Sequence, residues 1–147
     1  MNFEFKQFAD LSPEELYGIL QLRAEIFVVE QNCVYNDLDG LDKLAIHQFL
    51  SKDAEIIAYA RLLKPGTRFS EFSIGRVVVK QSERGKGLGI ELMEAAKNYV
   101  INEFGATKIK ISAQSYLQNF YENLGFEIVT EMYLEDGIPH FGMLYKV

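Results

Sequence analysis

The chain has 147 residues, 48% of them hydrophobic and 24% charged, which is typical of one globular domain and not of a disordered chain. Its formal net charge of −6 argues against a nucleic-acid-binding protein, because such a protein needs a basic face to neutralise phosphates. No apolar run is long enough to span a membrane, no secretion signal is evident, and the single cysteine excludes an internal disulfide or cysteine metal cluster, so we expect a cytoplasmic protein without metal.

The first half of the chain predicts a strand, a helix and two more strands. Residues 2–8 alternate apolar and polar side chains, as a strand does. Ser12-Pro13-Glu14-Glu15 has the capping residues of a helix start, and an apolar stripe continues that helix to about Glu30. Residues 31–45 lose periodicity and become acidic, which predicts a loop or a short irregular helix. Two strands joined by a tight hairpin are then expected at 46–52 and 55–64.

The second half predicts alternating strands and helices around a glycine-rich turn. The expected elements are a strand at 73–79, a helix at 87–103, a strand around 109–111, a helix at 117–124 that ends at Gly125, and strands at 126–134 and 139–146. This order indicates a mixed α/β sheet. We interpret residues 1–147 as a single domain, since no repeat, low-complexity stretch or linker interrupts them.

The turn Arg84-Gly85-Lys86-Gly87-Leu88-Gly89 lies between an apolar strand and a helix. Bare backbone N–H groups at a positive helix end are suited to a phosphate, although glycines alone also make a tight turn. A nucleotide-triphosphate loop would need Ser or Thr after Gly-Lys, where this chain has Gly87. The glycine spacing and the position past mid-chain also fit a dinucleotide-binding loop poorly.

Two motifs in order resemble the GNAT N-acetyltransferase superfamily. Arg84, Gly87 and Gly89 fill the fixed positions of its acetyl-coenzyme A loop, and Phe120-Tyr121-x-x-x-Gly125-Phe126 is similar to its second signature. The resemblance implies a mixed, mostly antiparallel sheet of about seven strands flanked by helices. It also implies a splay between two central strands at a coenzyme A cleft, following a bulge in the first of them.

The resemblance also implies roles for individual residues on the donor side. Tyr121 takes the position of the general acid, although an aromatic at helical spacing is by itself usually a core residue. Gln114 stands where the superfamily often has Asn, and Asn119 is a second candidate for that contact. The implied coenzyme-binding residues are Val77, Val78, Val79, Arg84, Gly85, Lys86, Gly87, Leu88, Gly89, Gln114, Asn119 and Tyr121.

Further segments, including 22–33 and 135–143, are similar to the ElaA-like bacterial acetyltransferases. That resemblance implies the type of reaction and leaves the acceptor open. We expect the acceptor site at the end of the first helix, the acidic loop and the last hairpin. Glu30, His47 and His140 are candidate general bases, although either histidine can equally be structural and Glu30 can equally pair with Arg23 or Arg61.

The sequence thus predicts transfer of an acetyl group from acetyl-coenzyme A to a primary amine, small or peptidic, by direct attack in a ternary complex. We interpret Asp37, Asp39 and Asp42 as a solvated acidic rim that attracts a cationic acceptor, with metal binding as a lesser reading because the rest of a calcium loop is missing. A non-catalytic acyl-coenzyme A sensor is the alternative function, and a nucleotide-binding module is a third. A homodimer is a candidate state; no nucleic-acid or membrane partner is expected.

Overall fold

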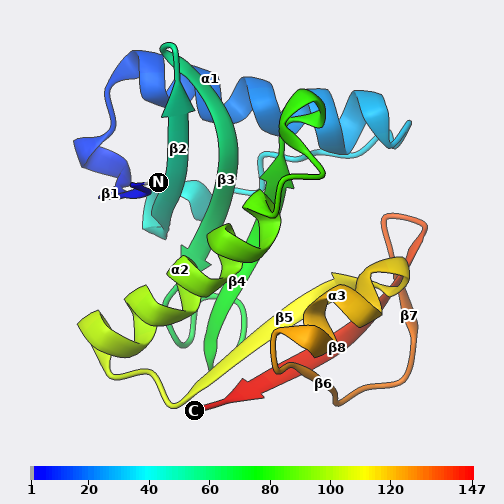
Figure 1. Cartoon of the computed structure of the whole chain (residues 1–147). Coiled ribbons are helices and arrows are strands. Elements are labelled where there is room, and N and C mark those ends of the chain that lie inside the picture. The colour runs from blue at the N-terminus through cyan, green and yellow to red at the C-terminus, as the bar shows by residue number, and fades with distance from the viewer. Residues whose placement is uncertain (1) are drawn as a thin grey trace.

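One mixed sheet organises the computed structural model, which describes residues 2–147 (Figure 1). Its strand order is β1-β2-β3-β4-β5-β8-β6, and β7 also pairs with β8. All neighbouring strands are antiparallel except β4 and β5. The strands are β1 (Glu4–Gln7), β2 (Ile46–Lys52), β3 (Glu55–Leu63), β4 (Phe72–Val79), β5 (Lys108–Gln114), β6 (Glu127–Ile128), β7 (Tyr133–Glu135) and β8 (Ile138–Lys146).

The first helix, α1 (Pro13–Arg23), begins as its sequence predicts. Ser12 accepts a hydrogen bond from the Glu15 N–H at 3.1 Å, and the Glu15 carboxylate accepts one from the Ser12 N–H at 2.9 Å. The helix does continue to Glu30, but its last seven residues form a π-helical segment, η2 (Ala24–Glu30). The hydrogen bond from the Gln31 N–H to the Ile26 carbonyl shows the wider turn, which the apolar stripe did not reveal.

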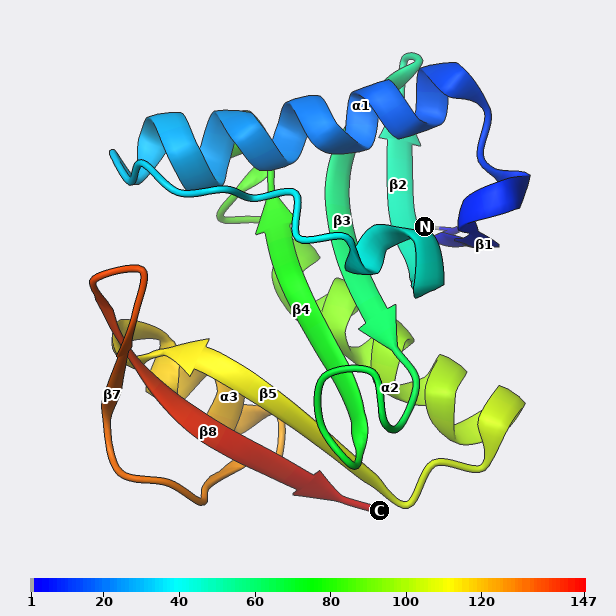
Figure 2. The ribbon, with the colours of Figure 1, turned by 180° about the vertical axis from the view of Figure 1, so that it is seen from behind.

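Helices cover both faces of the sheet (Figures 1 and 2). α1 packs on one face against Phe49, Ile56 and Tyr59, whereas α2 (Leu88–Phe104) and the short α3 (Gln118–Asn123) pack on the other. The two faces alternate along β3, where Tyr59 contacts the α1 side and its neighbours Ala58 and Ala60 the α2 side.

Four short 3-10 segments complete the described residues 2–147. They are η1 (Phe8–Asp10), η3 (Leu41–Leu44), η4 (Gln81–Glu83) and η5 (Ser115–Leu117). None of the helices within residues 2–147 is long and apolar enough to cross a membrane.

The sheet opens between its two halves. β4 and β5 pair only at Phe72–Ile109 and Ser73–Lys110, after which the two strands diverge (Figure 1). The diverging part of β4 contains a bulge: Tyr59 and Arg61 of β3 face Val78 and Gly75, so β4 has one extra residue. Arg76 sits in this bulge with φ of +49°. The predicted mixed, mostly antiparallel and splayed sheet is confirmed.

The predicted strand at 126–134 was wrong, because the structure divides it into β6 and β7 and thereby gives eight strands. Thr130 lies between them, and its hydroxyl accepts the hydrogen bond from the Gly142 N–H of β8 at 2.8 Å. A side chain thus replaces the backbone partner that a continuous strand would supply, and the segment leaves the sheet at that point.

Candidate functional site

A cleft of about 520 Å³ opens where β4 and β5 diverge. Its volume lies in the range of small-molecule sites. One wall consists of Ile74–Val79 of β4 together with the end of η2 and the segment that follows it. The other wall contains residues of β5, α3 and the β7–β8 hairpin, and the glycine turn closes one end.

The glycine turn has the backbone geometry that a phosphate cradle needs. Gly85 and Gly87 both have φ of +80°, a conformation that glycine adopts without strain. Gly87 is the N-cap of the 17-residue α2, and no side chain caps that helix end. The first N–H groups of α2 and its dipole therefore remain available to an anion, so the turn fits the phosphates of a coenzyme.

Most of the predicted coenzyme-binding residues lie around this cleft. Val77, Val78 and Val79 line it, as do Arg84, Gly85, Gly87, Leu88 and Gly89. Lys86 is outside the lining, and its ammonium pairs with Glu83 at 3.3 Å. Phe120 of α3 lies over Gly89, where an added Cβ would be 3.5 Å from the ring, so the two sequence motifs are in contact.

Tyr121 lines the same cleft although the residue is only 7% exposed. Phe120 and Phe126 pack edge-on against its ring at centroid distances of 5.1 and 6.0 Å. This burial raises the pKa of the Tyr121 phenol above its ordinary value of 10. The hydroxyl therefore keeps its proton at neutral pH, as a proton donor must.

Of the two amide candidates, only Gln114 lines the cleft. Its side chain exchanges hydrogen bonds of 3.3 Å with Gln31, which joins the end of β5 to the segment after η2. Asn119 is exposed and lies outside the lining.

Glu30 and His140 line the cleft, whereas His47 does not. The Glu30 carboxylate pairs with neither Arg23 nor Arg61, the partners considered from the sequence; it pairs with Arg84 at 2.8 Å. His140 lies beside Gln114 in the β5–β8 register.

The contacts of His140 determine which ring nitrogen carries a proton. Its Nδ1 is 2.6 Å from the Ile138 carbonyl oxygen, which can only accept, so Nδ1 donates. In the neutral ring Nε2 then has the free lone pair, and it lies 3.5 Å from a carboxylate oxygen of Glu135.

His47 is fully buried in β2 instead of facing a substrate. One ring nitrogen lies 2.7 Å from the Tyr59 hydroxyl and the other 2.8 Å from the Asp42 carbonyl oxygen. Burial lowers the pKa of its imidazole below 6.5. These contacts make His47 a neutral structural link between η3 and the sheet.

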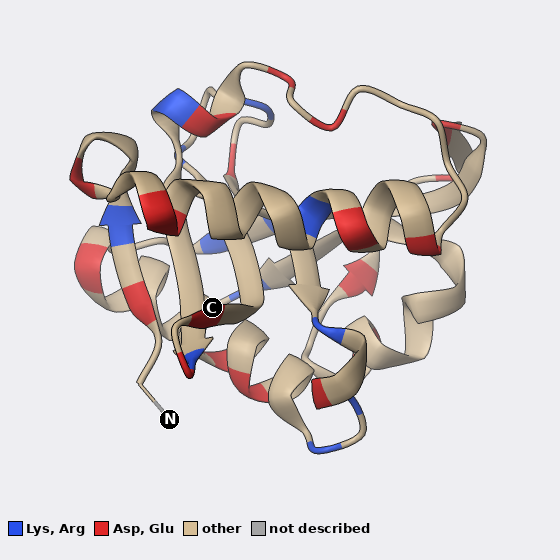
Figure 3. Cartoon of the chain, turned by 90° about the horizontal axis from the view of Figure 1, so that it is seen from above, with Lys and Arg blue, Asp and Glu red and all other residues tan. Residues whose placement is uncertain are grey.

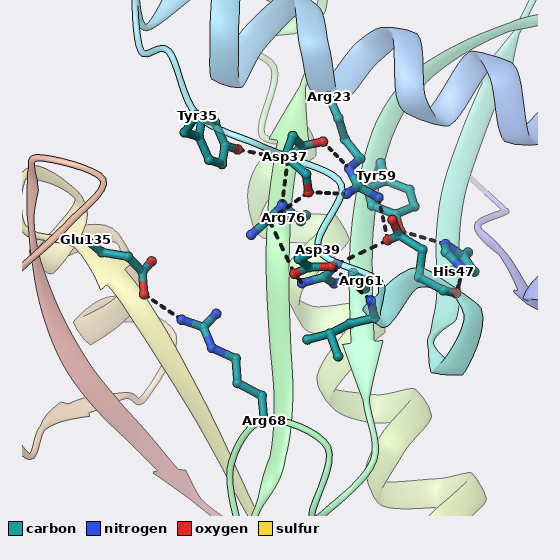
Figure 4. A network of polar contacts seen from close by, with 12 residues as sticks. Arg23, Tyr35, Asp37, Asp39, His47, Tyr59, Arg61, Arg68, Arg76 and Glu135 are labelled. Atoms are coloured by element: carbon teal, nitrogen blue, oxygen red, sulfur yellow. Dashed lines mark hydrogen bonds and ion pairs between the residues drawn. The ribbon is translucent and has the colours of Figure 1, made fainter.

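The expectation of a solvated acidic rim was wrong: Asp37 and Asp42 are buried, and three arginines pair with them and with the exposed Asp39 (Figure 4). The ion pairs are Arg23–Asp37 at 2.9 Å, Arg23–Asp42 at 2.6 Å, Arg61–Asp39 at 2.8 Å, Arg61–Asp42 at 3.1 Å, Arg76–Asp37 at 2.7 Å and Arg76–Asp39 at 3.4 Å. Elsewhere, Asp and Glu are distributed along α1 and the connecting loops (Figure 3). No group of side chains suited to a metal ion occurs in residues 2–147.

Residues 31–39 belong to the acidic loop that we expected at the acceptor site, and Gln31, Cys33 and Tyr35 line the cleft. The sequence reading missed the alternation of their side chains. The odd-numbered side chains have polar partners: Gln31 contacts Gln114 and the Cys33 thiol lies 3.5 Å from the Asp136 carbonyl oxygen, both across the cleft, and Tyr35 donates to Asp37 of the same segment at 2.8 Å. The even-numbered ones are exposed. This period of two is hard to detect in the sequence, because the apolar Val34 and Leu38 lie on the exposed side.

Arg68 is another residue of the site that sequence reasoning missed. It lies in the loop between β3 and β4 and pairs with Glu135 of β7 at 2.6 Å, which connects the two halves of the sheet (Figure 4). No local sequence motif predicts this contact, because the two residues are 67 positions apart.

Comparisons with known proteins agree with this geometry. The model of the acetyltransferase (GNAT) domain family matches residues 9–147. The ElaA protein of Escherichia coli strain K12 is 43% identical over 141 residues, covering 95% of this chain and 92% of ElaA. The crystal structure of E. coli ElaA covers 99% of this chain and 100% of its own, with a TM-score of 0.90.

Two other solved structures share the fold. An acyl-CoA N-acyltransferase from Pseudomonas aeruginosa is 44% identical, covers 99% of both chains and has a TM-score of 0.92. An aminoglycoside 6'-N-acetyltransferase complexed with coenzyme A covers 97% of this chain and 96% of its own, with a TM-score of 0.72; at 15% identity it shows similarity of fold alone.

Proposed function

This chain belongs to the GNAT acetyltransferase family, and we propose that it transfers the acetyl group of acetyl-coenzyme A to a primary amine by direct attack in a ternary complex. The observation that carries the proposal is one cleft lined by both the uncapped start of α2 and the buried phenol of Tyr121. The family and the acyl-CoA N-acyltransferase neighbour support acyl transfer in general. The neighbour complexed with coenzyme A supports the donor.

The donor would lie along β4 and the glycine turn. The N–H groups at Gly85, Gly87 and the start of α2 are suited to its phosphates, and Arg84 adds a cation. The backbone of Val77–Val79 lines the cleft where β4 has no β5 partner, so it can pair with the amide groups of the pantetheine arm.

In the proposed reaction the amine nitrogen forms a bond to the thioester carbonyl carbon, and the carbon–sulfur bond breaks. The thiolate that leaves takes the proton of the Tyr121 hydroxyl, whose burial keeps it protonated. The proton that the amine loses goes to a base at the acceptor end of the cleft. Glu30 and His140 line that cleft, and the Nδ1–Ile138 contact leaves Nε2 of His140 able to accept the proton.

Two measurements test this function. Calorimetry with coenzyme A and acetyl-coenzyme A should show binding, and an absence of heat at millimolar ligand would rule the proposal out. Release of free thiol from acetyl-coenzyme A should then increase with at least one member of a panel of polyamines, amino sugars, peptide amines and lysine, over the rate without amine. Binding without turnover across the panel would favour the alternative, a non-catalytic acyl-coenzyme A sensor.

The cytoplasmic location and the homodimer stay predictions.

A further inference from the structure

Arg84 is the cation of the glycine turn that lines the cleft, yet its guanidinium already has two protein partners. Its Nη1 donates to the Glu30 carboxylate at 2.8 Å, and its Nε donates to the Val79 carbonyl oxygen at 3.0 Å. The second contact holds the stem of Arg84 against the end of β4. The first brings it to the last residue of η2, 54 positions earlier in the chain.

The Glu30–Arg84 pair is partly exposed to solvent at the edge of the cleft. The two side chains are 32% and 40% exposed. Ion pairs with this exposure contribute between about 0 and 1 kcal/mol, because solvent screens them and ordering both side chains has an entropic cost. A multiply charged phosphate that accepts a charge-assisted hydrogen bond can therefore displace a single carboxylate from the guanidinium.

We propose that Glu30 is a positioning residue that competes with a phosphate group of the coenzyme for Arg84. The inference rests on the proposed function, since it requires a coenzyme in the cleft. When the coenzyme binds, Nη1 of Arg84 exchanges the Glu30 carboxylate for a phosphate oxygen, while Nε keeps its bond to Val79. The Glu30 carboxylate then becomes unpaired at the cleft where the cationic amine arrives.

This exchange has two consequences. The free protein binds the coenzyme less tightly than its phosphate cradle alone would allow, because Glu30 must first be displaced. The cleft gains an unpaired negative charge only after the donor is bound, so the donor favours subsequent binding of an ammonium group. Glu30 is the residue that links the two substrates.

Calorimetric titration of coenzyme A into four proteins tests the exchange: the unchanged chain, Glu30→Gln, Arg84→Ala and the double variant. We expect Glu30→Gln to tighten binding about two- to fivefold, the range that an exposed ion pair represents. Arg84→Ala should weaken binding, and Glu30→Gln should have no further effect in that background. Glu25→Gln is the matched control, because it removes the same charge from η2 at a residue outside the cleft lining.

Unchanged or weaker binding by a folded Glu30→Gln would overturn the inference, and so would equal tightening in the Arg84→Ala background, which would indicate general charge repulsion. Glu30→Asp keeps the charge but shortens the reach to Arg84. Tighter coenzyme binding by this variant supports a direct Glu30–Arg84 contact, and unchanged binding opposes such a contact. Dephospho-coenzyme A identifies the phosphate: tightening that persists points to the diphosphate, and tightening that vanishes points to the 3'-phosphate. No binding by the unchanged chain would instead reject the proposed function itself.

Discussion

Tyr121 and His47 show how burial prepares single residues for different tasks. Both are covered by the fold and both are thereby kept neutral, one as a phenol and one as an imidazole. Tyr121 lines the cleft, so its retained proton can be used in chemistry. His47 has both ring nitrogens in contact with protein, so its neutrality serves stability.

Removing the Tyr121 hydroxyl should slow turnover without loss of the donor. We expect Tyr121→Phe to lower kcat about 10²- to 10⁴-fold, the range for a general acid, and to change the Kd of coenzyme A little. Because burial raises the phenol pKa above 10, the unchanged chain should show no loss of rate from this group as the pH rises from 7 to 9. Thiol release and calorimetry measure the two quantities, and an unchanged kcat would remove Tyr121 from the mechanism.

His47 should make stability depend on pH. Its pKa is lowered in the folded state below 6.5, so the unfolded chain binds the proton more readily. The contribution of the neutral His47 to the unfolding free energy is therefore fully present above pH 6.5. It is lost as the pH falls from 6.5 toward the folded pKa, by at most about 1.4 kcal/mol per pH unit.

Urea unfolding at pH 7.5 and 5.5, compared between the unchanged chain and His47→Gln, isolates this contribution from all other groups. The difference in unfolding free energy between the two proteins should be smaller at pH 5.5. A difference that does not vary with pH would contradict the prediction.

At the scale of elements, interactions between near neighbours in the chain were predictable and distant ones were not. The capping box at Ser12 and the turn from Arg84 to Gly89 involve residues within a few positions, and both motifs formed as expected. The ion pairs that bury Asp37 and Asp42, in contrast, join residues 14 to 39 positions apart. The sequence places three aspartates in a loop but does not indicate which arginines pair with them.

The same distinction explains the error in the predicted strand at 126–134 and the parts of the cleft that the sequence did not indicate. Thr130 interrupts the predicted strand through a hydrogen bond to Gly142, 12 positions away, which no local propensity records. The coenzyme-binding residues stay a prediction from the family resemblance, and all but Lys86 and Asn119 line the cleft. The wall at 31–39 and the Arg68–Glu135 contact depend on the tertiary arrangement alone.

The buried ion pairs predict that the acidic segment is a structural element. Arg23 has no exposed side-chain surface and binds both Asp37 and Asp42. Arg23→Ala leaves two carboxylates without their shared partner, and we expect it to lower the unfolding free energy by about 3–5 kcal/mol.

Arg68→Ala is the matched control, because the Arg68–Glu135 pair is partly exposed and should contribute less than about 1 kcal/mol. Urea unfolding at neutral pH measures both variants. Equal effects would show that burial does not distinguish the two pairs.

At the scale of the whole molecule, two halves of the sheet meet at two residue pairs of β4 and β5. Beyond that junction, side chains supply the contacts across the opening, as between Arg68 and Glu135 or Gln31 and Gln114. A donor that contacts β4, the glycine turn and Tyr121 would add bonds between the halves.

Coenzyme A should therefore raise the unfolding temperature. At 100 times Kd the binding free energy contributes about 2.7 kcal/mol to stability, which corresponds to an increase in Tm of roughly 5–10 °C for a chain of this size. Gly87→Val should abolish the increase, since φ of +80° strains a β-branched residue and its side chain would enter the space around the turn. A Tm that does not change with coenzyme concentration in the unchanged chain would contradict the prediction.

The alternating wall at 31–39 has a consequence for how this protein can change over evolutionary time. Asp37 and Asp39 anchor the segment to arginines beneath it, whereas Cys33 and Tyr35 line the cleft. If the cleft binds the acceptor as proposed, replacement of Cys33 would alter the shape of the cleft without touching the ion pairs of Asp37 and Asp39. Selection could then adjust acceptor preference and structural integrity through different residues of one nine-residue segment.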